Sequence, residues 1–170
     1  LVVSAMVAEG ADPVQARRSC SLFDSKGLVV AARPGGLAGH KLPYAHDRPA
    51  EADLVAAMRS LEPTALIGVS ATGGSFTQAV VEEMTRLNPR PIVFALSNPT
   101  SKSECTAEQA YAWSRGQALF ASGSPFDPVT IGGQTLVSRQ GNNSYIFPGV
   151  GLGAIAVHST RITDEMFMAA

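Results

Sequence analysis

Short apolar runs that stop at polar turns form the main pattern of this chain. Ile92–Leu96 is one such run, and it ends on Ser97-Asn98-Pro99. A run of this kind predicts a buried parallel strand, and proline cannot continue its hydrogen-bond ladder. Leu119–Ala121 repeats the pattern and runs into Ser122-Gly123-Ser124-Pro125. The pattern therefore predicts two strands that end at polar turns on the same edge of a sheet.

Helical periodicity separates the predicted strands. Residues 51–61 and 77–87 place apolar side chains on one face, and in the second helix the expected buried stripe is Phe76, Ala79, Val80 and Met84. A further strand is predicted at 65–69, and Thr106–Gln109 matches the capping box that opens a helix. Strands that alternate with helices predict an α/β fold with a doubly wound parallel sheet, a Rossmann-like arrangement.

The rest of the chain has weaker signals. We expect a short helix over 13–18, strand character at 21–23 and 28–30 around the polar turn 24–27, and an irregular connection over 33–50. Residues 130–140 predict a hairpin that turns at Gly132-Gly133. The glycine-rich stretch from Phe147 predicts a helix that packs closely on its neighbours. Residues 1–10 resemble the second half of a helix and 163–170 the start of one, so we expect a fragment.

Composition narrows the function classes. The chain has 170 residues, 45% hydrophobic and 16% charged, and a net charge of −1. Nothing in this balance favours nucleic acid, and no basic block or membrane span is apparent. Two distant cysteines, Cys20 and Cys105, indicate neither a disulfide framework nor a metal motif. They favour a reducing compartment, the cytoplasm or, in a eukaryote, an organelle matrix.

Three amide side chains are candidates for ligand binding. Asn98 follows a predicted strand at the sheet edge where open α/β folds bind ligands. Asn142 and Asn143 are adjacent and follow Gly141. An amide at a turn more often caps the backbone, but amides also recognise carboxylates and the nicotinamide carboxamide without changing charge.

Asp24 is a candidate for binding the adenosine ribose of a dinucleotide. A dinucleotide fold places such a carboxylate at the end of its second strand, about twenty residues past a glycine-rich turn, and that turn would precede Leu1. An aspartate in this position is also a common turn former. Ser25, Lys26 and Lys41 are candidates for binding a 2′-phosphate instead. The loop 70–75 precedes a helix and could present backbone N–H groups to a phosphate.

No catalytic group is predicted from spacing. The three histidines, His40, His46 and His158, have no ligand spacing and are interpreted as structural or surface residues. Ser124 lacks the flanking glycines of a nucleophile elbow. The sequence contains no HExxH or CxxC motif.

Several long sequence motifs resemble the malic enzyme family's nucleotide-binding domain, and the resemblance covers nearly the whole chain. They are FALSNPTSKSECTAE (94–108), FASGSPFDPV (120–129), QGNNSYIFPG (140–149), LFDSKGLV (22–29) and PTALIGV (63–69). The resemblance implies an NAD(P)-binding domain over 1–170, truncated at both ends. It also implies oxidative decarboxylation of L-malate to pyruvate and CO₂, with NADP⁺ or NAD⁺ and with Mg²⁺ or Mn²⁺.

The resemblance further implies roles for particular residues. Asp24 corresponds to the adenosine-ribose ligand, and Asn98 to the residue that touches the nicotinamide ribose and malate. Asn142 and Asn143 correspond to the pair that contacts the nicotinamide amide and the malate carboxylate, and Val69 and Ser70 to the loop along the dinucleotide. Lys41, with Ser25 beside Asp24, implies a preference for NADP⁺.

The family's acid–base pair, acidic metal ligands and glycine-rich turn belong to segments upstream of Leu1 by this resemblance. We therefore expect no catalytic or metal-binding residue in the chain, weak cofactor binding by the chain alone, and a homo-oligomer for the complete enzyme. The alternative is a non-catalytic nucleotide-binding remnant that keeps the fold without the chemistry.

Overall fold

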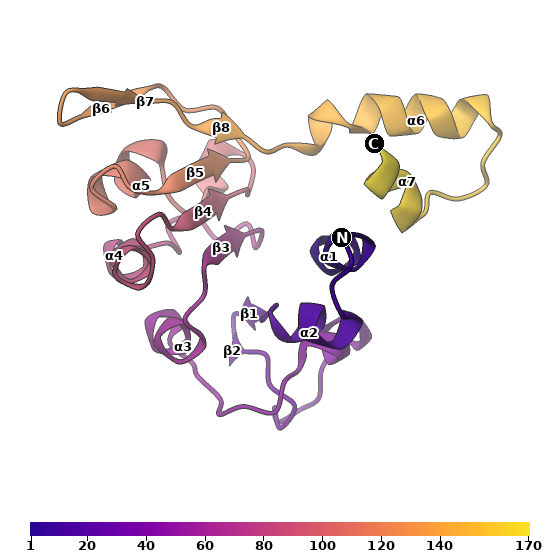
Figure 1. Cartoon of the computed structure of the whole chain (residues 1–170), viewed down its shortest axis with the longest axis horizontal. Coiled ribbons are helices and arrows are strands. Elements are labelled where there is room, and N and C mark those ends of the chain that lie inside the picture. The colour runs from indigo at the N-terminus through magenta and orange to yellow at the C-terminus, as the bar shows by residue number, and fades with distance from the viewer. The chain divides into compact units, whose positions relative to one another are not determined.

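The computed structural model describes residues 1–170, which divide into two compact units (Figure 1). The smaller unit contains residues 1–50 and 143–170, and the larger unit contains residues 51–142.

The larger unit is built on a parallel sheet. Its strands are β3 (Ala65–Gly68), β4 (Ile92–Ala95), β5 (Leu119–Ser122) and β8 (Arg139–Gln140), in the order β3-β4-β5-β8. Every neighbouring pair is parallel. The predicted strands at 65–69, 92–96 and 119–121 and the predicted α/β class are thus confirmed, whereas β8 was not expected from the sequence.

Three helices cover the sheet face that carries Val93 and Ala95. They are α3 (Leu54–Leu61), α4 (Gln78–Leu87) and α5 (Ala107–Trp113). Side chains two apart on a strand point to the same face, and both Val93 and Ala95 are fully buried. Phe120, level with Val93 on the neighbouring strand, joins the same core. The core therefore lies between this one face of the sheet and the three helices.

The helix starts follow local sequence signals. The Asp53 carboxylate accepts a hydrogen bond of 2.8 Å from the N–H of Ala56, which caps α3. Thr106 and Gln109 form the predicted capping box at the start of α5, each side chain accepting from the other's backbone N–H. These caps use donors that the first turn of a helix would otherwise leave without partners.

One residue of the predicted stripe on α4 is wrong. Ala79 is exposed, and the buried positions are Val80, Val81 and Met84, with Phe76 buried just before the helix. At helical spacing Val80, Val81 and Met84 share one face of the helix, and Ala79 lies on the opposite face. The apolar face is therefore turned toward Val81 rather than toward Ala79.

The predicted glycine hairpin is also present. β6 (Val129–Ile131) and β7 (Gln134–Leu136) pair antiparallel and turn at Gly132 and Gly133. Both glycines have positive φ, 58° and 80°, as a tight two-residue turn of this kind requires. In Figure 1 this hairpin extends from the larger unit beside β8.

The smaller unit begins with α1 (Val2–Ala8) and α2 (Pro13–Arg18), as predicted. The strand prediction is only partly right. Phe23–Asp24 (β1) and Gly27–Leu28 (β2) are strands of two residues each. They pair as an antiparallel hairpin that is separate from the parallel sheet. Asp24 therefore ends a strand but not a strand of the main sheet. Between β2 and residue 50 the chain is irregular except for a 3₁₀ turn at Gly39–Tyr44 and an isolated parallel bridge between Val30 and His46.

The last helices are α6 (Phe147–Ala156) and α7 (Asp164–Ala169). The expectation that the glycines of α6 pack closely is wrong. A Cβ at Gly149, Gly151 or Gly153 would meet no atom within 4 Å, and Val150 is the only buried residue of the helix. None of the helices in the chain is both long and apolar enough to cross a bilayer.

We predict that Met84→Ala destabilises the larger unit strongly. Met84 is fully buried between α4 and the sheet, so truncation leaves a cavity, and we expect a loss of about 2–5 kcal/mol in the free energy of unfolding. Urea unfolding of the purified chain measures it. Val137→Ala, at an exposed apolar position of the same unit, is the control and should change stability by no more than about 0.5 kcal/mol. Equal losses in both variants would contradict this core.

Candidate functional site

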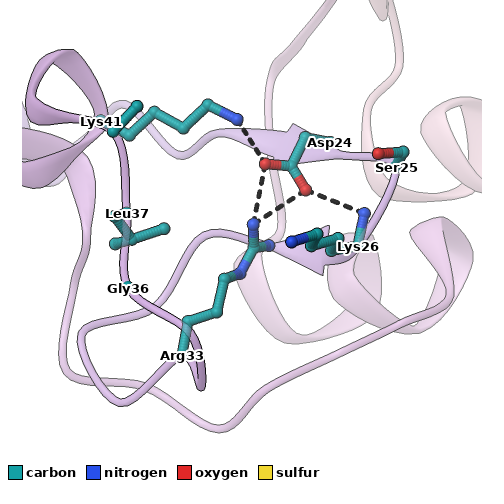
Figure 2. Close-up of a pocket in the computed structure, with 8 residues that line it drawn as sticks. Asp24, Ser25, Lys26, Arg33, Gly36, Leu37 and Lys41 are labelled. Carbon is teal, nitrogen blue, oxygen red and sulfur yellow. Dashed lines mark hydrogen bonds and ion pairs between the residues drawn. The ribbon is translucent and has the colours of Figure 1, made fainter.

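Two cations, Arg33 and Lys41, pair with the carboxylate of Asp24 in the smaller unit, and Lys26 lines the same pocket (Figure 2). The Arg33 Nη1 donates to both Asp24 oxygens, at 2.8 and 2.7 Å, and the Lys41 Nζ lies 2.5 Å from Oδ2. Lys26 donates only its backbone N–H, 2.9 Å from Oδ1. We call Asp24, Lys26, Arg33 and Lys41 the cation cluster. Three positive side chains and one carboxylate give it an excess of positive charge.

Arg33 is held in place on both sides of its guanidinium. Its Nη2 donates to the backbone oxygens of Gly27 and Leu28, at 2.5 and 2.8 Å, and its side chain is only 8% exposed. Both terminal nitrogens are thus engaged within the protein. The residue ties the irregular connection to the β1–β2 hairpin, and it neutralises Asp24 without presenting those donors to a ligand.

The two lysines differ from Arg33 in this respect. The Lys41 ammonium has three donors, of which one is directed at Asp24, and no ion pair occupies the Lys26 ammonium. Both line a pocket of about 200 Å³ together with Ser25 and residues 36–38. The arrangement therefore suits an anion bound by lysine ammonium groups and by the hydroxyl of Ser25.

The cations also fix the protonation state of Asp24. Hydrogen bonds from Arg33, and then from Lys41, hold the pKa of this carboxyl far below its usual range. Asp24 is charged at every pH at which the chain would work. It also accepts from the Lys26 N–H two residues on, as the turn-former interpretation expects.

The second group lies at the carboxyl edge of the parallel sheet in the larger unit. Gly68, Ala95, Ser122 and Gln140 are level with one another across the four strands. Two residues further along each strand the register therefore brings Ser70, Ser97, Ser124 and Asn142 to this edge. We call these residues, with Val69 and Asn98, the polar edge.

Within the polar edge, Asn98 is bound to Ser124 through its side-chain oxygen. The Ser124 Oγ donates to Asn98 Oδ1 at 2.8 Å, whereas the Nδ2 group of Asn98 has no hydrogen-bond partner in the chain. The residue is exposed. Its side chain is thus oriented by the neighbouring strand end, and it keeps two N–H donors for a ligand oxygen.

Gly123 allows the loops after β4 and β5 to approach closely. A Cβ at Gly123 would collide with the backbone oxygen of Leu96 and lie 2.9 Å from Asn98 Oδ1. The Gly123 oxygen accepts from Asn142 Nδ2 at 2.8 Å and from Gln140 Nε2 at 3.1 Å. Glycine at this position therefore brings Asn98 and Asn142 to the same strand ends.

The remaining predicted residues are exposed or lie in the other unit. Val69 and Ser70 begin the loop after β3 and are exposed. Asn143 is exposed, starts a 3₁₀ turn (Asn143–Tyr145) and belongs to the smaller unit, as do Asp24, Ser25 and Lys41. The structure therefore groups Asp24, Ser25 and Lys41 together, and groups Asn98 with Asn142, Val69 and Ser70.

Arg33 and Gly123 are important residues that sequence reasoning missed. Arg33 stands before Pro34-Gly35-Gly36 in an irregular connection, where no pattern shows its partner. Gly123 was noted only as part of a turn. The repeated apolar-run-then-polar-turn pattern was a signal for the second of these, because parallel strands that end level bring their turns together.

Two other kinds of site are not formed by these residues. No group of three or more His, Cys, Asp and Glu side chains is placed to hold a metal ion. His46 has a structural role, with its Nε2 2.8 Å from the Cys20 oxygen, and His40 and His158 are exposed, as predicted. Burial, and then the charge of Glu104, raise the pKa of the Cys105 thiol to about 12, so Cys105 is not a nucleophile at neutral pH.

Comparisons with a family model and with known proteins all match this chain to one enzyme family. A family model described as "Malic enzyme, NAD binding domain" matches residues 1–170. The NADP-dependent malic enzyme of Mus musculus is 52% identical over 169 residues, which is 99% of this chain and 29% of that protein. NADP-dependent malic enzyme 1 of Arabidopsis thaliana is 51% identical over 156 residues, 92% of this chain and 27% of that protein.

A chloroplastic relative is equally similar. NADP-dependent malic enzyme 4 of Arabidopsis thaliana is 53% identical over 156 residues, 92% of this chain and 24% of that protein. This chain therefore spans between 24% and 29% of the length of these three relatives.

We predict that the contribution of Asp24 to stability is lost in acid. Its pKa in the folded protein lies below the ordinary value of 3.8, so the charged cluster stabilises fully above that value and loses its effect as pH falls below it. At pH 7 Asp24→Asn should cost about 1–2 kcal/mol in urea unfolding.

The difference between the unaltered chain and Asp24→Asn should then shrink as pH falls from 4 toward 2. Asp47→Asn, which removes an exposed carboxylate that forms no ion pair, controls for the loss of one charge. A difference that stays constant over the acid range would show that the ion pairs of Asp24 do not stabilise the fold.

Proposed function

We propose that this chain, which belongs to the malic enzyme family, supplies cofactor-binding and substrate-orienting residues to an enzyme that converts L-malate to pyruvate and CO₂ with reduction of NAD(P)⁺. The observation that carries the proposal is the presence of two groups suited to the two ends of such a cofactor. One is a cation cluster with free ammonium donors, and the other is an amide-rich edge on parallel strands.

The cation cluster supports a preference for NADP⁺ over NAD⁺. A 2′-phosphate carries up to two negative charges, and Asp24 alone would repel it. Asp24 is instead paired with Arg33 and Lys41, and the ammonium groups of Lys26 and Lys41 keep donors for a phosphate. Ser25 adds a hydroxyl at the same pocket. The carboxylate holds the cations in place, and the lysines bind the 2′-phosphate.

The polar edge is suited to bind the nicotinamide end of the same cofactor and the substrate. Asn98 would bind the nicotinamide ribose and malate, Asn142 the nicotinamide amide, and Asn143 a malate carboxylate. Val69 and Ser70 would lie along the dinucleotide. Amide donors orient carboxylates and hydroxyls without a change of their own charge. When bound, the nicotinamide ring supplies the chemistry, since it accepts the hydride from the C2 carbon of malate.

The residues of this chain do not fit a Mg²⁺ or Mn²⁺ site, because no three acidic, histidine or cysteine side chains converge. We therefore assign no metal ligand and no general acid or base within it. We infer that a divalent metal and the proton-transfer groups act from other segments of the complete enzyme. Residues 1–170 are then one part of an NAD(P)-binding domain.

The rival is a non-catalytic nucleotide-binding remnant. The coding sequence immediately upstream of Leu1 separates the two: a glycine-rich turn preceded by acidic metal ligands fits an active enzyme, and a genuine start codon fits a remnant. We further propose a homo-oligomer of the complete enzyme in the cytoplasm or an organelle matrix, with malate and pyruvate as its small-molecule partners.

We predict that Lys41→Ala lowers affinity for NADP⁺ selectively. Loss of one charge-assisted contact to the 2′-phosphate should weaken NADP⁺ binding about tenfold and leave NAD⁺ binding unchanged, as measured by isothermal titration calorimetry. Arg18→Ala, which removes an exposed cation from α2 in the same unit, should affect both cofactors equally little. A parallel loss of both affinities in Lys41→Ala would refute a 2′-phosphate contact.

We also predict that the purified chain binds cofactor weakly and does not turn over malate. Every residue assigned here binds or orients, and none is placed to move a proton or hold a metal. Absorbance at the wavelength of reduced nicotinamide, recorded with malate, Mg²⁺ and either cofactor, measures turnover. Malate-dependent NADPH production by this chain alone would refute the assignment.

A further inference from the structure

Glu104 is a buried acid outside the groups described so far. It is fully buried, and it lies in the segment between β4 and α5, two residues before the Thr106 cap. None of the chain's four ion pairs includes it. A buried carboxylate without a cation is costly, and an apolar side chain at the position would avoid that cost. Its presence therefore points to a demand on geometry.

The carboxylate of Glu104 accepts two hydrogen bonds from Ser97, which lies just after β4. The Ser97 Oγ donates to Oε1 at 2.5 Å, and the Ser97 N–H donates to Oε2 at 3.3 Å. The Ser97 Oγ also accepts a hydrogen bond from the Ala71 N–H, at 2.9 Å. One carboxylate thus connects the end of β4 with the loop after β3.

Backbone hydrogen bonds join the loop after β3 to the segment that carries Glu104. The Gly74 N–H donates to the Ser103 oxygen and the Phe76 N–H to the Glu104 oxygen, each at 3.0 Å. Gly68, the last residue of β3, makes room for the acid, since a Cβ there would collide with the Glu104 carboxyl carbon. The backbone contacts hold the far part of the loop, and the Glu104–Ser97 pair holds the part beside Val69 and Ser70.

Glu83 shows what a buried acid with a purely structural role looks like in this chain. It is 6% exposed and lies on α4, where it pairs with Arg86 of the same helix and Arg59 of α3. Hydrogen bonds and charge from these arginines lower its pKa. Its contacts join two helices, whereas both side-chain hydrogen bonds of Glu104 come from Ser97, a residue of the polar edge.

We propose that Glu104 is a positioning residue for the nicotinamide end of the cofactor. Through Ser97 it sets the relative positions of the loop 69–72 and of Asn98, the two segments of the polar edge that approach the ligand. The inference rests on the proposed function, since it assumes that the polar edge binds the nicotinamide half. Glu104 itself does not touch the ligand.

The test uses two half-cofactors as probes with the full 170-residue chain. Oxidised nicotinamide mononucleotide tests the polar edge, and adenosine 2′,5′-bisphosphate tests the cation cluster. Ligand-observed NMR titration measures both affinities in the unaltered chain, in Glu104→Gln and in Ser97→Ala. Glutamine keeps the volume of Glu104 but can accept only one of the two hydrogen bonds from Ser97. Glu83→Gln is the matched control, because it also neutralises a buried glutamate.

We expect Glu104→Gln and Ser97→Ala to weaken binding of the mononucleotide about fivefold and to leave binding of the bisphosphate unchanged. Glu83→Gln should lower stability and change neither affinity. If Glu104→Gln does not fold, Ser97→Ala decides, because it keeps the carboxylate and removes only the relay. Mononucleotide affinity that is unchanged in the variants, or lowered equally in Glu83→Gln, would overturn the positioning role.

Hydrogen exchange of the unliganded chain separates this inference from the proposed function. The Ala71 amide should exchange faster in both edge variants than in the unaltered chain, while Gly74 and Phe76 keep their protection. If the unaltered chain binds no mononucleotide, the proposed function fails, and exchange alone then decides whether Glu104 locks the two loops. Unchanged exchange at Ala71 would overturn the lock.

Discussion

The parallel pairing of β4 with β3 on one side and β5 on the other is the constraint on which the polar edge depends. Because Gly68, Ala95 and Ser122 are level, the residues after each strand leave the sheet at the same height. The alternation of β4 holds this register, since a slip of one residue would turn the buried Val93 and Ala95 away from the helices. Core packing thus determines where Asn98 and Ser124 meet.

In each candidate group, an acidic side chain is bonded to other residues of the protein. It thereby orients hydrogen-bond donors that remain available to a ligand. Asp24 is paired with Arg33 and Lys41, and the lysines keep ammonium donors at the pocket. Glu104 is bonded to Ser97, next to an Asn98 whose Nδ2 has no partner in the chain. In each case the negative charge is used for geometry, and the groups left for a ligand are positive or neutral. This pattern suits a phosphorylated, carboxylate-bearing set of ligands.

Local signals in the sequence predicted most of the fold. The apolar run 92–96, the Thr106 capping box and the Gly132-Gly133 turn depend on neighbours in the chain, and the structure contains all three elements. What sequence reasoning missed depends on distant contacts. Arg33 meets Asp24 across nine residues of irregular chain, and Glu104 meets Ala71 only through Ser97. The helix α6 shows the opposite failure, because its glycines suggested close neighbours that are not there.

We propose that this chain binds the adenosine 2′-phosphate through the cation cluster and the nicotinamide end of the cofactor through the polar edge. The most direct test is a crystal structure of the complete protein that carries this chain, grown with NADP⁺. We expect the 2′-phosphate within hydrogen-bond distance of the Lys41 ammonium, and Asn98 Nδ2 in contact with the nicotinamide ribose. A 2′-phosphate bound away from Lys41, or a nicotinamide ribose remote from Asn98, would contradict it.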